Sequence, residues 1–104
     1  MRTLLKASMD TNAANTAISD GSFPKIMTET IDRIKPEATY FFAEDGNRSC
    51  FMVFDLKDSS EIPSIAEPLF MALNAKVELI PIMNLEDLQK GLKAVAKAQY
   101  EVVQ

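Results

Sequence analysis

The feature that most constrains the fold of this chain is a pair of β-rich segments joined by a short turn. Residues 37–44 (EATYFFAE) and 48–56 (RSCFMVFDL) are rich in aromatic and β-branched side chains, and Asp45-Gly46-Asn47 lies between them. Such side chains favour extended strands. Glycine and asparagine tolerate the positive φ angles that tight hairpin turns require. The sequence therefore predicts a β-hairpin in the middle of the chain.

The segment before this hairpin predicts one strand followed by two helices. Residues 2–9 (RTLLKASM) predict the strand, and residues 12–18 predict a short helix that Asp20-Gly21 interrupts. A second helix is expected to have Pro24 in its first turn, where proline is tolerated, and to stop before Pro36.

The segment after the hairpin predicts a helix, a strand and a last helix. Asp58 to Ser60 are suited to open the first of these helices, whose apolar stripe runs from Ile62 to Leu73. Residues 76–83 (KVELIPIM) predict a strand, and Pro81 restricts it to an edge or an end of the sheet. Asn84 is then expected to cap a C-terminal helix.

The resulting order is β-α-β-β-α-β with an extra C-terminal helix. This is the split βαβ, or ferredoxin-like, pattern, so the predicted fold class is α+β with a four-stranded antiparallel sheet. Right-handed crossovers would place the strands in the spatial order 4-1-3-2. With 104 residues, the whole chain (1–104) is expected to form a single domain.

Both faces of the predicted sheet carry large apolar side chains. Cys50, Met52 and Phe54 belong to one face of the third strand, whereas Phe51 and Val53 belong to the other. On the fourth strand, Ile80 and Ile82 belong to that second face as well. An exposed apolar face of this kind marks an interaction surface. We therefore expect a homodimer whose interface contains four side chains, namely Phe51, Val53, Ile80 and Ile82. The alternative is that the C-terminal helix covers this face within one subunit.

Composition excludes several classes of function. The formal net charge is −4 and no basic run is present, so nucleic acid is not an expected partner. No apolar run approaches the length of a membrane span and no signal segment is visible, so no membrane partner and a cytoplasmic location are expected.

The chain contains no histidine and a single cysteine, Cys50. Catalytic triads with histidine, histidine metal sites and cysteine metal clusters are therefore excluded, and neither a metal nor a cofactor is expected. The position of Cys50 on an apolar face favours a buried structural thiol over a nucleophile.

Strand alternation predicts a polar set on the second sheet face. Its members come from all four strands, and the expected ligand-binding residues are Lys6, Ser8, Tyr40, Asp55 and Glu78. In this hypothesis Lys6 binds an anionic group or acts as a base with a lowered pKa, with Asp55 or Glu78 as its carboxylate partner. The alternative is an ordinary cross-strand ion pair between Lys6 and Glu78.

The strand order and the two-faced apolar strands resemble the dimeric α/β-barrel superfamily, in which two ferredoxin-like sheets pack face to face. The segments IKPEATYFFAEDGNR, FDLKD, IPSIAEPLF and LNAKVELIPIMNLEDLQKGL are also similar to a family of small uncharacterised bacterial proteins. This resemblance implies a dimeric barrel but transfers no catalytic residues.

Three functions follow as hypotheses. The first is a homodimeric small-molecule-binding or enzymatic domain with a cleft at the sheet. The second is a non-catalytic assembly or interaction module, and the third is a cofactor-independent monooxygenase or isomerase like some members of the superfamily. Whether the chain is an enzyme at all stays open at this point.

Overall fold

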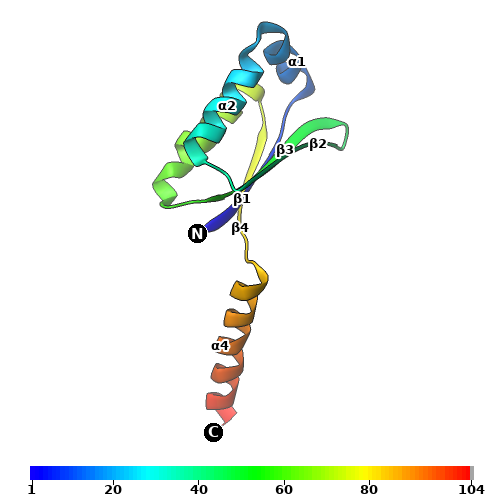
Figure 1. The fold of residues 1–104 in the computed structure, drawn as a ribbon. Helices are drawn as coiled ribbons and strands as arrows, with labels where there is room; N and C mark the ends of the chain where they lie inside the picture. Colours follow the sequence, from blue (N-terminus) through cyan, green and yellow to red (C-terminus); the bar gives the residue numbers. More distant parts are fainter. Residues whose placement is uncertain (104) are drawn as a thin grey trace.

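The computed structural model describes the backbone of residues 1–103 and the side chains of residues 1–98. Over this part of the chain, four strands and four α-helices follow one another, with a short 3₁₀ turn (η1) before the third helix (Figure 1). In chain order the elements are β1 Arg2–Ser8, α1 Thr11–Asp20, α2 Ser22–Ile34, β2 Ala38–Glu44, β3 Asn47–Asp55, η1 Ser59–Glu61, α3 Ile62–Leu73, β4 Lys76–Pro81 and α4 Leu85–Val103.

The strands form one antiparallel sheet in the order β2-β3-β1-β4. The predicted α+β class and the predicted strand order are confirmed, and the arrangement is compatible with the ferredoxin-like pattern. β4 lies at an edge of the sheet, as Pro81 required. It ends at Pro81, so Ile82 lies beyond the strand, although its backbone N–H still donates to the carbonyl of Arg2 at 3.2 Å.

The predicted hairpin joins β2 to β3 through a two-residue turn. Glu44 pairs with Asn47, and the intervening Asp45 and Gly46 have φ angles of 53° and 77°. Positive φ at both central residues defines a type I′ turn, whose twist matches that of the flanking strands. Glycine at the second position adopts this conformation without steric cost.

Side-chain caps fix where several helices begin. The Asp10 carboxylate accepts a hydrogen bond from the Ala13 N–H at 2.9 Å, which satisfies one of the free donors at the start of α1. At α4, the Asn84 side chain accepts from the Asp87 N–H at 2.8 Å, and the Asp87 carboxylate accepts from the Asn84 N–H at 3.2 Å. This reciprocal pair is a capping box, and it confirms Asn84 as the cap of the last helix.

The hydrophobic core lies between one face of the sheet and helices α1, α2 and α3, which gather on that side (Figure 1). The sheet contributes side chains such as Leu5, Met52 and Phe54, and α3 contributes Ile65 and Leu69. All of these are almost completely buried. The helices therefore cover one face of the sheet and leave the opposite face open.

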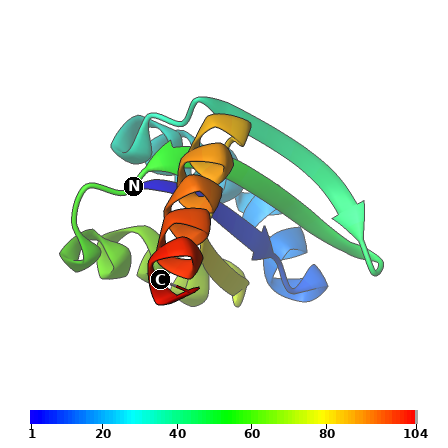
Figure 2. The same cartoon turned by 90° about the horizontal axis from the view of Figure 1, so that it is seen from below.

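Helix α4 does not cover that open face. It leaves the sheet at the end of β4 and projects away, and no other described element packs along it (Figures 1 and 2). The longest dimension of the molecule is 65 Å and the Cα radius of gyration is 17.8 Å, whereas a compact chain of this length has about 13 Å. The alternative in which the C-terminal helix covers the second sheet face of its own subunit is therefore wrong. Among the residues that the structure describes, none of the helices combines the length and the hydrophobicity that a membrane span requires.

Candidate functional site

The open sheet face is organised in rungs that run across the four strands. One rung is entirely apolar and consists of Ala38, Val53, Leu4 and Ile80. Ile80 keeps 38% of its surface exposed, while Leu4 and Val53 are half-buried by their neighbours. An uncovered apolar rung across the full width of a sheet is a typical interaction surface.

The next rung combines aromatic and charged side chains, in the order Tyr40, Phe51, Lys6 and Glu78. The Phe51 ring packs beside two rings of β2, with centroid separations of 5.3 Å to Tyr40 and 5.6 Å to Phe42. These separations and tilted orientations are those of favourable aromatic pairs. Within this rung, the open face is therefore aromatic on the β2–β3 side and charged on the β1–β4 side.

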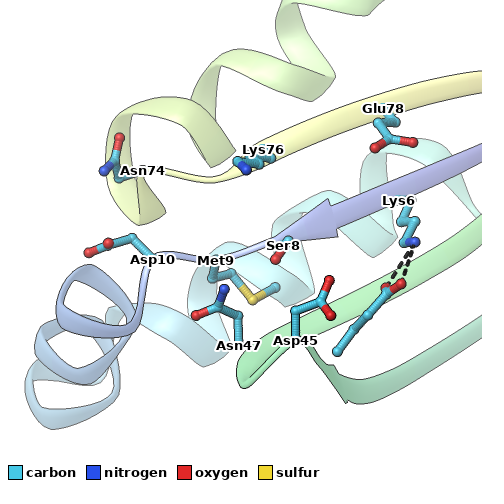
Figure 3. A pocket seen from close by; sticks show the side chains of 10 residues that line it. Lys6, Ser8, Met9, Asp10, Asp45, Asn47, Asn74, Lys76 and Glu78 are labelled. Atoms are coloured by element: carbon cyan, nitrogen blue, oxygen red, sulfur yellow. Dashed lines mark hydrogen bonds and ion pairs between the residues drawn. The ribbon is translucent and has the colours of Figure 1, made fainter.

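A cleft of about 300 Å³ lies at one end of this face, where β1 ends, β4 begins and the β2–β3 turn closes (Figure 3). Apart from Met9, the residues that line it are polar. The lining residues are Lys6, Ser8, Met9, Asp10, Glu44, Asp45, Asn47, Asn74, Lys76 and Glu78. The antiparallel topology brings these residues together from three separate segments of the chain, 6–10, 44–47 and 74–78.

The best-defined contact in the cleft is an ion pair between Lys6 and Glu44. The Lys6 Nζ lies 2.8 Å from Glu44 Oε2 and donates a hydrogen bond to Oε1 at 3.0 Å. This hydrogen bond is the main cause of a raised pKa of Lys6, and the negative charges of Glu44, Glu78 and Asp45 act in the same direction. Lys6 therefore stays protonated at neutral pH, and the hypothesis that it is a base with a lowered pKa is wrong.

The carboxylate that Lys6 binds was also not the expected one. Glu78 lies directly opposite Lys6 on β4, but it influences Lys6 only through its charge. Glu44 reaches Lys6 from the far end of β2, across the intervening strand β3. The cross-strand ion pair between Lys6 and Glu78 is therefore not formed.

Three of the five predicted ligand-binding residues, Lys6, Ser8 and Glu78, lie together in the cleft. Tyr40 belongs to the same face and the same rung as Lys6, but it is two strands away and does not line the cleft. Asp55 lies at the opposite end of the sheet, where it pairs with Arg2 in register.

The surroundings of Asp55 form a separate polar cluster. Its carboxylate accepts a hydrogen bond from the amino group of Met1 at 2.6 Å, and this contact lowers the pKa of Asp55. Arg2 binds Glu37 at 2.8 Å and approaches Asp87 of α4 at 3.5 Å. Asp55 therefore has no part in the Lys6 cleft.

The expected ligand-binding set left out the strand-end and turn residues that complete the cleft. These are Asp10, Asp45, Asn47 and Asn74, together with Lys76 and the ion-pair partner Glu44. The predicted strand order could have indicated them, because each lies at a strand end or turn that this order brings to the same end of the sheet. Within the described residues, no three acidic or cysteine side chains converge closely enough to hold a metal ion.

Cys50 is buried in the core on the helix-covered face, as expected. Removal from water raises the pKa of its thiol to about 11. The thiol is therefore protonated and unreactive at neutral pH.

The fold and the cleft define a small α+β domain with a four-stranded antiparallel sheet, one open face and a polar cleft at the end of that face. No protein-family model matches the chain, and no curated protein matches it.

Proposed function

We propose that this chain is a homodimeric small-molecule-binding domain, in which the open sheet face assembles with a second copy and the Lys6 cleft binds a small polar ligand. The observation that carries this proposal is the open face itself, where an apolar rung and an aromatic cluster lead directly into a charged cleft. The apolar part suits a protein interface, and the cleft has the size and the convergent polar groups of a ligand site.

The assembly half of the proposal follows from the cost of leaving the open face in water. Burying a large apolar side chain contributes about 1.5–3 kcal/mol relative to full exposure. Leu4, Val53 and Ile80 obtain only part of this contribution within one subunit. Sheets usually bury both faces or leave one polar face in solvent, and a large part of this face is apolar.

The chemistry of the ligand follows from the charges that line the cleft. Four carboxylates (Asp10, Glu44, Asp45, Glu78) face two ammonium groups (Lys6, Lys76). Asp10 caps α1 and Glu44 neutralises Lys6. Asp45 and Glu78 make no ion pair with another described residue. The cleft therefore favours a ligand that brings a cationic or donor-rich group to these two carboxylates, such as an amine or an amino acid.

The ligand half can be tested by native mass spectrometry of the purified chain, followed by calorimetric titration with a short diamine (putrescine) and free amino acids. We expect at least one of these probes to bind, and Glu78→Gln to weaken that binding at least tenfold. Glu67→Gln, which changes an exposed carboxylate on α3, is the matched control and should bind like the unmodified chain. Absence of binding to every probe, with no co-purified ligand in the native spectrum, would refute this half.

The assembly half is tested independently by sedimentation equilibrium. A monomer has a mass of 11.6 kDa, and we expect twice that value at micromolar concentration. A single species at the monomer mass would refute the assembly half of the proposal.

A second function, an assembly module without a ligand, is favoured by one observation. The Lys6 ammonium is already paired with Glu44, so this charge needs no ligand to neutralise it. A stable dimer that binds none of the probes would establish this second function in place of the first.

A further inference from the structure

Helix α4 carries a broad uncharged face that no other described part of its own subunit covers. Leu85, Leu88, Leu92 and Val95 recur at spacings of three and four residues, which places them on one stripe of the helix. Their exposed fractions range from 41% to 69%. Exposed fractions of this size show that the apolar stripe of the helix is in contact with solvent.

The residues beside this stripe widen the uncharged face. In a seven-residue repeat with the stripe at positions a and d, the flanking e and g positions carry Gln89, Gly91, Ala96 and Ala98. Every charged side chain from Glu86 to Lys97 falls at the remaining positions, on the far side of the helix. The face is therefore free of charge across its whole width, and its flanks are small enough for another surface to approach closely.

The start of α4 is fixed in a direction that keeps this face away from its own sheet. The Asn84–Asp87 capping box sets the first turn, and Asp87 also approaches Arg2 of β1 at 3.5 Å. From this anchor the helix runs outward beyond the end of β4 (Figure 1). In Figure 2, which looks from below, the helix lies in front of the body of the molecule.

We infer that α4 is an exchanged arm: in the proposed homodimer, the uncharged face of each α4 packs on the open sheet face of the other copy. This inference rests on the dimer proposed above and adds the element that covers the sheet. Each chain would then bury both of its uncovered apolar surfaces through one reciprocal contact, as a two-fold interface requires.

The available area supports this occupant. Complete burial of the four stripe side chains would remove on the order of 400 Å² from water, about half of the roughly 800 Å² that each partner contributes to a stable dimer. The exposed parts of Tyr40, Ile80 and their neighbours on the sheet supply a comparable area. Neither surface alone reaches the size of a stable interface, whereas the two together do.

The flanks of the stripe disfavour the simpler pairing of α4 with α4 of a second copy. Two-stranded coiled coils generally use charged e and g side chains to fix partner and register. Here those positions carry an amide and three small residues, so nothing would fix the register of a helix pair. A broad, uncharged helix face with small flanking residues is better matched to the broad surface of a sheet.

The first test compares two lysine substitutions on α4 in the full-length chain. Leu92→Lys places a charge in the centre of the proposed contact and should raise the dimer dissociation constant at least tenfold. Ala94→Lys places the same charge on the far side of the helix and should leave the constant unchanged. Equal dissociation constants for the two variants would overturn the inference, even where the dimer itself is confirmed.

The second test is chemical cross-linking of the Leu92→Cys, Val53→Cys double variant with a short bismaleimide. The buried Cys50 thiol does not compete, because it is protonated and inaccessible. A product of dimer mass, formed also when the two single variants are mixed, supports exchange of the arm. An internal link within one chain overturns it, and so does a product from Leu92→Cys alone, which would show α4 pairing with α4.

These outcomes separate the inference from the proposal beneath it. A chain that sediments as a dimer without the α4–sheet cross-link contradicts only the exchanged arm. A chain that sediments as a monomer contradicts the exchanged arm and the proposed dimer.

Discussion

Replacing Val53 by aspartate tests the open face where its composition is most apolar. Val53 lies in the second strand of the rung, between Ala38 of β2 and Leu4 of β1. Its side chain is half-buried within the subunit, so a carboxylate at this position can still reach water in a monomer. In the proposed dimer the same carboxylate would be enclosed between two apolar surfaces.

The expected magnitude follows from the cost of an enclosed charge and from symmetry. An unpaired buried charge costs about 3–5 kcal/mol, and a two-fold interface contains the substitution twice. Even one such cost corresponds to a change in the dissociation constant of roughly 100- to 4,000-fold. The nearest cations on the neighbouring strand, Arg2 and Lys6, are already bound to Glu37 and Glu44 and are not free to neutralise the new charge.

Sedimentation equilibrium across a concentration series measures this change directly. We expect Val53→Asp to be monomeric at concentrations where the unmodified chain is a dimer, with an unchanged far-UV circular dichroism spectrum. Met71→Asp is the matched control, because Met71 lies on α3 with 81% of its surface exposed and should tolerate the charge. If Val53→Asp and Met71→Asp dimerise equally well, the open face is not the interface.

Two further predictions concern the stability of the subunit. Gly46→Ala should lower the free energy of unfolding by about 1–2 kcal/mol in denaturant titrations, since the φ of 77° at this position is strained for alanine. Gly91→Ala is the control, because Gly91 lies in the body of α4 with open space around it, and this substitution should not lower the free energy of unfolding. Burial raises the pKa of Cys50 from 9.0 to about 11, so the folded chain holds this proton where the unfolded chain releases it. The contribution of the thiol is therefore complete below pH 9 and is lost as pH rises to 11, by roughly 2–3 kcal/mol. Cys50→Ala should show a correspondingly shallower loss of stability over that interval, and parallel pH profiles for the two chains would contradict the assignment.

The parts of the fold that were predictable from sequence are those that short-range chemistry determines. The hairpin follows from Asp45-Gly46 because positive φ is required at the turn itself. The edge position of β4 follows from Pro81, which lacks a donor for a further strand. The direction of α4 was not predictable, because its apolar stripe would satisfy a contact with its own sheet as well as one with another copy.

For the candidate site, the sequence predicted which face of the sheet carries the residues, but not where along the strands they lie. Strand alternation assigns Lys6, Ser8 and Glu78 to one face correctly, but it gives no position along the strands. Asp55 shares that face yet pairs with Arg2, four residues from Lys6, which corresponds to about 13 Å along β1. Glu44 was not expected as the partner of Lys6 for the complementary reason: a long side chain at the end of an edge strand can reach across its neighbour, and no pairing rule describes that reach.

In the proposed dimer, Glu78 would couple the two halves of the proposed function physically. In an isolated subunit this carboxylate faces water, where its charge costs little. A second copy that covers the open face would exclude water from the Lys6 rung and strengthen every electrostatic interaction there, both the attraction between Lys6 and Glu44 and the cost of leaving Glu78 unneutralised. A cationic ligand group would remove that cost, so in this proposal it would bind more favourably to the dimer than to the monomer. By linkage, the same ligand would then stabilise the dimer by an equal amount. Occupation of the cleft and assembly of the sheet faces would then be one equilibrium, with the charge on Glu78 as the physical connection between them.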